Sequence, residues 1–171
     1  MTKARHASHG IARYLTRRRK SAHRGPAGAS PDTLIAAADA QPSEVRVIRY
    51  EKDEIAEFTP QSVAAMFEGR GKRWIDVRGL ADLPMINQLG EQLGLHPLIV
   101  ADIVHTNQRP KVELHDAYLV VVMRMPRVSR EEMSEQLTLI LTDQCVVTFQ
   151  ERPGDCFDGV RQRLRSGAGR M

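Results

Sequence analysis

The order of apolar and polar positions predicts strands and helices that alternate from residue 45 onward. Apolar and polar side chains alternate over part of residues 45–50, which is the period of a β-strand. A second short strand is predicted for residues 73–77. Between them, Thr59 and Pro60 form a helix cap and first-turn pair, which predicts a helix that ends near Gly69.

Two more helices are predicted in the middle of the chain. Asp82 can cap a helix whose apolar stripe runs to Leu93, and Gly94 can stop it. The segment that follows, from His96 to Val104, reads HPLIVADIV. Its proline stands at the first helical position, where the missing N–H would be unpaired in any case.

This third helix carries a single charged side chain, Asp102, among seven apolar ones. A carboxylate on a helix that is apolar on nearly every side is costly to bury unless a cation meets it. Asp102 is therefore the first candidate for a functional residue. The simplest alternative is an ordinary surface charge or an ion pair, for which Arg109 is the nearest basic candidate.

The second half of the chain predicts a loop, three strands and a last helix. Pro110 disfavours helical geometry at the residue before it, so residues 106–111 are expected to form a loop. Strands are predicted for residues 118–125, 136–141 and 145–150, and the short link between the last two makes them an antiparallel hairpin. Apolar positions from Phe157 predict the last helix, which Gly167 can end. This order predicts an α/β (α+β) fold, with a mixed parallel and antiparallel sheet and helical layers on its faces.

The net charge of +4 conceals two parts of opposite sign. Residues 1–31 contain eight basic and no acidic side chains, so the other 140 residues carry 17 basic and 21 acidic ones. We therefore expect a basic, disordered tail over residues 1–43, whose composition also resembles an organellar transit peptide, and one folded domain over residues 44–171. The acidic body gives no support for binding to nucleic acid.

The remaining patterns exclude several function classes. The longest apolar run, Ala117 to Met123, has the length of a strand and falls well short of the roughly 20 residues of a membrane-spanning helix. His96, His105 and His115 do not have the spacing of a known zinc site. No nucleophile motif of the G-x-S-x-G type occurs, so the chain is not expected to be an enzyme.

Three segments together resemble a known family. The stretch from His96 to Met125, HPLIVADIVHTNQRPKVELHDAYLVVVMRM, closely resembles the cytoplasmic domain of the CorA family of magnesium and cobalt transport proteins. The sequences EQLTLILTDQCVVTFQE, from Glu135, and GDCFDGVRQRLRSG, from Gly154, continue that resemblance. It extends more weakly to about Val45.

The resemblance implies the architecture of a larger protein. Members are homopentamers in which an N-terminal α/β domain precedes a long stalk helix and two membrane helices with a Gly-Met-Asn signature. The present sequence has no Gly-Met-Asn and is expected to stop before the stalk. It would then be a soluble fragment of an integral protein of the inner membrane, located on the cytoplasmic face.

The resemblance also gives Asp102 a role. In the family, an acid at this position contributes to a regulatory divalent-cation site together with a carboxylate on a neighbouring subunit's stalk. Asp102 would thus be one half of an intersubunit metal site for Mg²⁺, Co²⁺ or another divalent cation, and this fragment alone would bind the ion weakly. Many members have a second acid just before it, where this chain has Ala101.

Three alternatives remain open from the sequence. The motifs do not separate magnesium transporters from the zinc-transporting branch of the same family. A stand-alone binding module that uses its basic tail belongs to another class. A metal-dependent hydrolase would need a carboxylate such as Asp76, Asp82 or Asp116.

Overall fold

The computed structural model describes residues 30, 33–51, 54–126 and 134–167. Seven strands, one 3₁₀ helix and three α-helices follow one another in these ranges: β1 (Glu44–Glu51), β2 (Glu54–Phe58), η1 (Ala64–Phe67), β3 (Lys72–Arg78), α2 (Leu83–Gln92), α3 (Pro97–Val104), β4 (Lys111–Leu114), β5 (Leu119–Pro126), β6 (Ser134–Leu141), β7 (Cys145–Gln150) and α4 (Asp158–Arg165).

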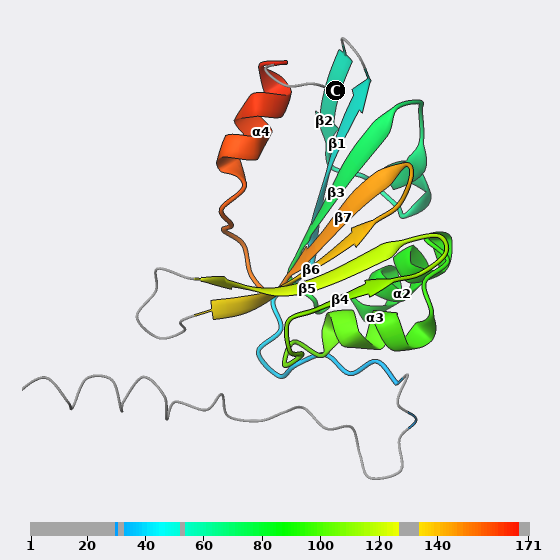
Figure 1. Cartoon of the computed structure of the whole chain (residues 1–171), viewed down its shortest axis with the longest axis vertical. Coiled ribbons are helices and arrows are strands. Elements are labelled where there is room, and N and C mark those ends of the chain that lie inside the picture. The colour runs from blue at the N-terminus through cyan, green and yellow to red at the C-terminus, as the bar shows by residue number, and fades with distance from the viewer. Residues whose placement is uncertain (1–29, 31–32, 52–53, 127–133, 168–171) are drawn as a thin grey trace, which may run out of the picture.

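The strands form one mixed sheet in the order β2-β1-β3-β7-β6-β5-β4. Neighbouring strands are antiparallel except β3 and β7, which run parallel because the chain crosses over through the helices and the β4–β6 strands. Helices α2 and α3 lie on one side of the sheet and α4 lies on the other (Figure 1). The predicted mixed sheet with helices on its faces is thereby confirmed.

The alternation of side chains along β3 explains this layering. Successive side chains of a strand point to opposite faces of its sheet. Ile75 and Val77 belong to the apolar core together with residues of α2 and α3. Trp74 and Asp76 point the other way and meet α4 instead.

The two helices on the core side begin as the sequence predicts. The Asp82 side chain caps α2 by accepting a hydrogen bond from the backbone N–H of Met85 at 3.0 Å. The His96 imidazole Nδ1 caps α3 by accepting from the N–H of Leu98 at 3.2 Å. The predicted antiparallel hairpin of residues 136–141 and 145–150 is also present, as β6 and β7.

The helix predicted after Thr59 is wrong in its start and length. Only the 3₁₀ helix η1 forms there, and Val63 stands at its N-cap without a side-chain cap. The turn starts later than expected because the Ser62 hydroxyl, rather than Thr59, accepts a hydrogen bond from a backbone N–H, that of Ala65 at 3.2 Å. At the other end, the guanidinium group of Arg73 donates to the backbone oxygens of Met66, Gly69 and Gly71. Arg73 thus satisfies carbonyl groups that have no helical partner where the short turn ends.

Two short strands were absent from the prediction. Strand β2 has the sequence EIAEF, in which only part of the pattern is apolar. Strand β4 begins at Lys111, inside the loop that Pro110 predicted. Both are edge strands of the sheet in the described residues, where fewer side chains need to be buried.

The expected tail, residues 1–43, falls mainly outside the described residues and stays a prediction. Its last part, residues 33–43, contains no helix or strand but does contact the body. Leu34 packs against the apolar core, and the backbone oxygen of Gln41 accepts from the N–H of Ala81 at 3.1 Å. Among the described residues, no helix combines the length and the apolar character needed to cross a membrane.

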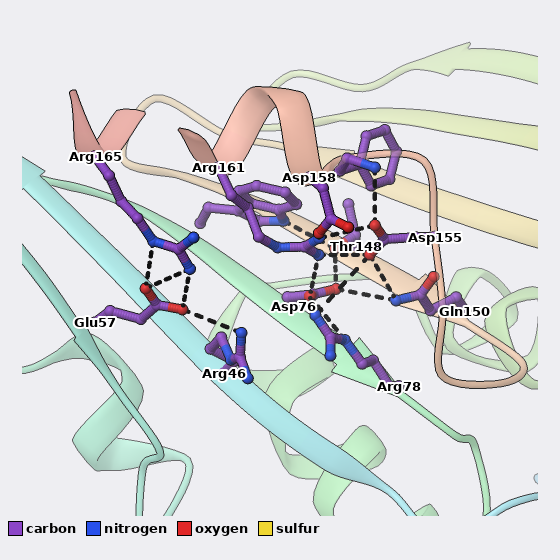
Figure 2. A network of polar contacts seen from close by, with 12 residues as sticks. Arg46, Glu57, Asp76, Arg78, Thr148, Gln150, Asp155, Asp158, Arg161 and Arg165 are labelled. Atoms are coloured by element: carbon purple, nitrogen blue, oxygen red, sulfur yellow. Dashed lines mark hydrogen bonds and ion pairs between the residues drawn. The ribbon is translucent and has the colours of Figure 1, made fainter. Parts of the chain in front are cut away.

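A buried ion-pair network attaches α4 to the face of the sheet opposite to α2 and α3 (Figure 2). The Arg161 guanidinium group reaches Asp76 of β3 at 2.8 Å and also pairs with Asp155 and Asp158. It lies 4.9 Å from the centre of the Trp74 ring, close enough for a cation–π contact. The Arg161 residue is only 3% exposed, so its charge depends on these partners.

The network also shifts the ionisation of its members. Burial works against the charged form of Asp155, but hydrogen bonds from Arg161 and from the N–H of Phe157 outweigh it and lower the pKa of Asp155 from 3.8 to about 2. Hydrogen bonding to Asp155 is the main reason that the pKa of Arg161 is raised. Asp155 and Arg161 therefore both remain ionised at neutral pH.

Because α2 packs closely on α3 at Gly90, adding a methyl group at this position is expected to destabilise the fold. A Cβ atom at Gly90 would lie 2.6 Å from Cγ2 of Val100, whose branched side chain has little rotamer freedom on a helix. Overpacking costs about 1–3 kcal/mol, and the better helix propensity of alanine offsets about 1 kcal/mol of that. Gly90→Ala is therefore expected to lower the free energy of unfolding by about 1 kcal/mol in urea denaturation.

Gly159 is the matched control, because it also lies in a helix but has no described atom within 4 Å of the position that a Cβ would take. Gly159→Ala is expected to leave the free energy of unfolding unchanged or to raise it by up to about 1 kcal/mol. A Gly90→Ala variant as stable as Gly159→Ala would contradict the close α2–α3 contact.

The α4 network predicts a large difference between two arginines of the same helix. Arg161→Met removes the more deeply buried of the two guanidinium groups, Arg161 and Arg78, that Asp76 and Asp155 share. This loss is expected to cost about 3–5 kcal/mol of unfolding free energy. Arg165 pairs with Glu57 but its side chain is 48% exposed. Arg165→Met is therefore expected to cost no more than about 1 kcal/mol. Equal losses for the two variants in urea denaturation would show that the network does not hold α4.

The lowered pKa of Asp155 predicts an acid-sensitive contribution to stability. A carboxyl group with a depressed pKa in the folded state stabilises the fold above its unfolded pKa and loses that effect as the pH falls through its folded pKa. The window here runs from 3.8 down to about 2. The stability difference between the unaltered chain and Asp155→Asn should therefore shrink as the pH falls through that window, in denaturation curves measured at several pH values. A constant difference would mean that Asp155 is not held ionised by Arg161.

Candidate functional site

Asp102 lies on the one exposed stripe of α3. The helix residues on the other sides, Ile99, Val100, Ala101, Ile103 and Val104, are buried against the sheet and α2. Leu98 stands four residues before Asp102, on the same face of the helix, and is exposed. The Asp102 side chain itself is 27% exposed, so the carboxylate sits at the boundary between the core and the solvent.

The cation that meets Asp102 is Lys111. Its Nζ atom lies 2.6 Å from Oδ2 of Asp102. The other carboxylate oxygen, Oδ1, accepts a hydrogen bond from Nε2 of Gln108 at 2.8 Å. The predicted partner Arg109 is exposed and is replaced in this role by Lys111. The predicted ion pair of Asp102 within the chain is therefore present, but its cation is Lys111 and not Arg109.

The register of β4 explains why Lys111 is the partner. Lys111 and Glu113 pair with Val122 and Val120 of β5, whose side chains lie in the core. Because side chains alternate along a strand, Lys111 and Glu113 point to the face that carries α3, and Val112 points to the other face. Strand β4 is at the edge of the described sheet, so this group of charges lies at the periphery of the molecule.

Lys111 is shared between two carboxylates. Its Nζ atom also lies 2.9 Å from Oε1 of Glu113. Burial works against the charge of Lys111, but the hydrogen bonds to Asp102 and Glu113 outweigh it and raise the pKa of Lys111. Lys111 therefore stays an ammonium group at neutral pH and is shared between two acidic side chains.

Gln136 fixes the backbone beneath these charges. It is buried in β6, and its Nε2 atom donates to the backbone oxygen of Asp102 at 3.1 Å. Its Oε1 atom accepts from the N–H of Gln108 at 3.0 Å. One side chain thus ties the end of α3 to the loop that follows. Sequence reasoning missed Gln136, although an amide side chain at the start of a predicted strand is a signal that could have identified it, because a buried amide needs hydrogen-bond partners.

The described residues do not form a complete magnesium site by themselves. Mg²⁺ prefers six oxygen ligands and retains several waters, so carboxylate and amide oxygens are suitable donors. The described ranges contain no group of three or more His, Cys, Asp or Glu side chains placed to hold a metal ion. Asp102 has the right chemistry, but both of its oxygens already accept hydrogen bonds from its own chain. Any complete site would need further ligands from elsewhere.

The carboxylates considered for a hydrolase have structural roles where the structure shows their contacts. Asp76 is paired with Arg161 and Arg78 and accepts from Thr148. Asp82 caps α2. Asp116 lies on the surface. The contacts of the described residues bring none of the three to Asp102, so they give this alternative no support.

Comparison with known proteins identifies the family. The profile of the family described as "CorA-like Mg2+ transporter protein" matches residues 70–171. The chain is 36% identical over 149 residues to the cobalt/magnesium transport protein CorA of Thermotoga maritima, an alignment that covers 83% of this chain and 42% of that protein. The chain spans less than half the length of the curated relatives it matches.

Solved structures show the same fold at lower sequence identity. The CorA magnesium transporter of Methanocaldococcus jannaschii superposes with a TM-score of 0.53 at 14% identity, over 72% of this chain and 37% of that one. The ZntB cytoplasmic domain of Vibrio parahaemolyticus superposes with a TM-score of 0.56 at 11% identity, over 75% of this chain and 52% of that one. Together with the family profile and the 36% identity, these likenesses lead to one conclusion: the chain belongs to the CorA family of divalent-cation transport proteins.

Proposed function

We propose that this chain is the cytoplasmic, cation-sensing domain of a CorA-type magnesium and cobalt transporter. In this proposal Asp102 provides one half of a regulatory site for Mg²⁺ between two subunits of a homo-oligomer, a pentamer in the complete protein. The identity of 36% to a cobalt/magnesium transport protein supports the choice of ions. The likeness to the ZntB cytoplasmic domain, at 11% identity, concerns the fold and does not favour zinc.

The observation that carries the proposal is the position of the Asp102 carboxylate. The side chain is partly exposed on a helix whose other faces are fixed in the core. A rigid helix presents a charge more reproducibly than a loop does, and Gln136 fixes the helix end further. Asp102 also lies beside the edge strand β4, where a neighbouring subunit can approach without displacing core residues.

Electrostatics then connects the charge to regulation. Asp102 and a carboxylate of a neighbouring subunit would repel each other at short range, which disfavours close association. A divalent cation held between them would supply the missing positive charge. Because such an ion binds the associated arrangement better than the separated one, it shifts the population toward association. Abundant cytoplasmic Mg²⁺ would thus favour a closed transporter, and scarcity would release the domains.

The location follows from the same proposal. The chain would lie at the cytoplasmic face of the inner membrane, attached through membrane helices of the complete protein. The alternative of a stand-alone module depends on the basic tail, residues 1–43, whose lysine and arginine side chains all lie outside the described residues. No contact in the described ranges therefore favours that alternative over the transporter.

The proposal predicts weak binding of Mg²⁺ by the 171-residue chain and its dependence on Asp102. One carboxylate without a complete cage is expected to bind with a dissociation constant in roughly the millimolar range. We expect amide signals of residues 96–111 to shift during titration with MgCl₂ in NMR spectra of the ¹⁵N-labelled chain. Asp102→Asn should abolish those shifts, because it removes the charge and keeps the shape.

Asp116→Asn is the matched control, since Asp116 is an exposed acid outside the group around Lys111. It should leave the titration unchanged. Micromolar binding by the unaltered chain would indicate a complete local site and contradict the half-site. In the complete transporter, Asp102→Ala should weaken the closure of the pore by Mg²⁺, and an unchanged Mg²⁺ dependence would refute the sensing role.

A further inference from the structure

Lys111 occupies the place of a cation between two carboxylates. Its Nζ atom lies 2.6 Å from Oδ2 of Asp102 and 2.9 Å from Oε1 of Glu113. The oxygen that Lys111 contacts on Asp102 is therefore not available to another ion while this pair is intact. An incoming cation must displace the ammonium group or share the carboxylate with it.

The chemistry of lysine makes displacement feasible. An ammonium group is a compact charge on a flexible four-carbon stem, whereas a guanidinium group would form a planar two-point contact. The Lys111 side chain is 27% exposed, so the stem has room to move toward solvent. Glu113 is on the same face of β4 and already accepts from Nζ. Lys111 can leave Asp102 and remain paired with Glu113.

The other partner of Asp102 does not compete in this way. Gln108 donates from a neutral amide to Oδ1, the carboxylate oxygen that Lys111 does not contact. Its donor group orients the carboxylate without neutralising it. Among the contacts of the described residues, Lys111 is therefore the only cationic partner that can neutralise the Asp102 carboxylate.

We propose that Lys111 is a built-in competitor for Asp102, which a divalent cation displaces onto Glu113 and which thereby sets the affinity of the candidate site. This inference rests on the proposed function, because it assumes that Asp102 is the residue that binds the ion. The attraction to a carboxylate scales with the charge of the cation, so a divalent ion gains twice as much as a monovalent one at equal distance. The competitor therefore raises the concentration at which Mg²⁺ binds and disfavours monovalent ions.

The test compares charge-removing and charge-keeping variants of Lys111. Mg²⁺ binding by the 171-residue chain is measured by NMR titration at constant ionic strength, because salt screens exposed ion pairs. Lys111→Met removes the ammonium group and keeps an unbranched stem, and we expect it to tighten Mg²⁺ binding by about fivefold, which corresponds to the upper end for a partly exposed pair. Lys111→Gln should act in the same direction. Lys111→Arg, which keeps the charge, should not tighten binding.

Two double variants identify the cause of a gain. Lys111→Met combined with Asp102→Asn should lose the gain, because the ligand is gone. Lys111→Met combined with Glu113→Gln should retain it. A gain that vanishes in this second combination would overturn the proposal, because Glu113 would then be a new ligand and not the acceptor of a displaced lysine.

The remaining outcomes separate this inference from the proposed function. If Asp102→Asn abolishes binding but neither Lys111→Met nor Lys111→Gln tightens it, the competitor role is wrong and Asp102 remains the ligand. If Asp102→Asn changes no titration in any background, the proposed function fails together with the inference. If Lys111→Arg tightens binding as much as Lys111→Met, the charge of Lys111 is not what limits the affinity and the inference is refuted.

Discussion

A carboxylate on a helix that is apolar on nearly every side can persist only where a cation and hydrogen-bond donors meet it. In this chain that constraint is satisfied by the Asp102–Lys111 ion pair, which is supported by Gln108. The pair joins α3 to the edge strand β4, and Gln136 anchors the backbone below it. The only side chain of α3 that is not apolar is therefore also the point where the helix is tied to the sheet edge.

A second group of charges solves a similar problem on the opposite face. Strand β3 sends Ile75 and Val77 into the core and Trp74 and Asp76 toward α4. The buried charge of Asp76 is met by Arg161, which the aromatic ring of Trp74 also contacts. The two groups differ in exposure. Arg161 is enclosed and suits a permanent attachment, whereas Lys111 is partly exposed and held by a flexible stem, which suits exchange.

Local signals were enough to predict much of this structure. The helix from Pro97 to Val104 and the isolated charge of Asp102 both follow from neighbouring residues, because the start signal of a proline and the apolar pattern are short-range effects. The mixed sheet with helical layers followed from the order of the elements. Thr59 was misleading because Ser62, only three residues later, accepts a hydrogen bond from the N–H of Ala65 instead.

The partner of Asp102 could not be predicted for a related reason. Arg109 is nearer in the sequence, but the register of β4 on β5 directs Lys111 to the α3 face. Gln136 is distant in sequence and reaches Asp102 only through the pairing of β5 with β6. The residue that carries the charge was thus predictable, whereas its partners depend on long-range strand pairing. The assignment of Asp102 to a cation site remains a prediction, which the resemblance suggested and the partly exposed position of the carboxylate supports.

The displacement of Lys111 by a cation is tested most directly on the Lys111 ammonium group itself. NMR spectra that detect ¹⁵N-labelled lysine Nζ signals show whether an ammonium group is paired or free. If Mg²⁺ displaces Lys111 from Asp102, the Lys111 signal shifts when MgCl₂ is added, at the same concentration at which the amide signals near Asp102 respond. A Lys111 signal that stays unchanged while those amide signals saturate would contradict this displacement, because the cation would then bind with the ion pair of Lys111 and Asp102 intact.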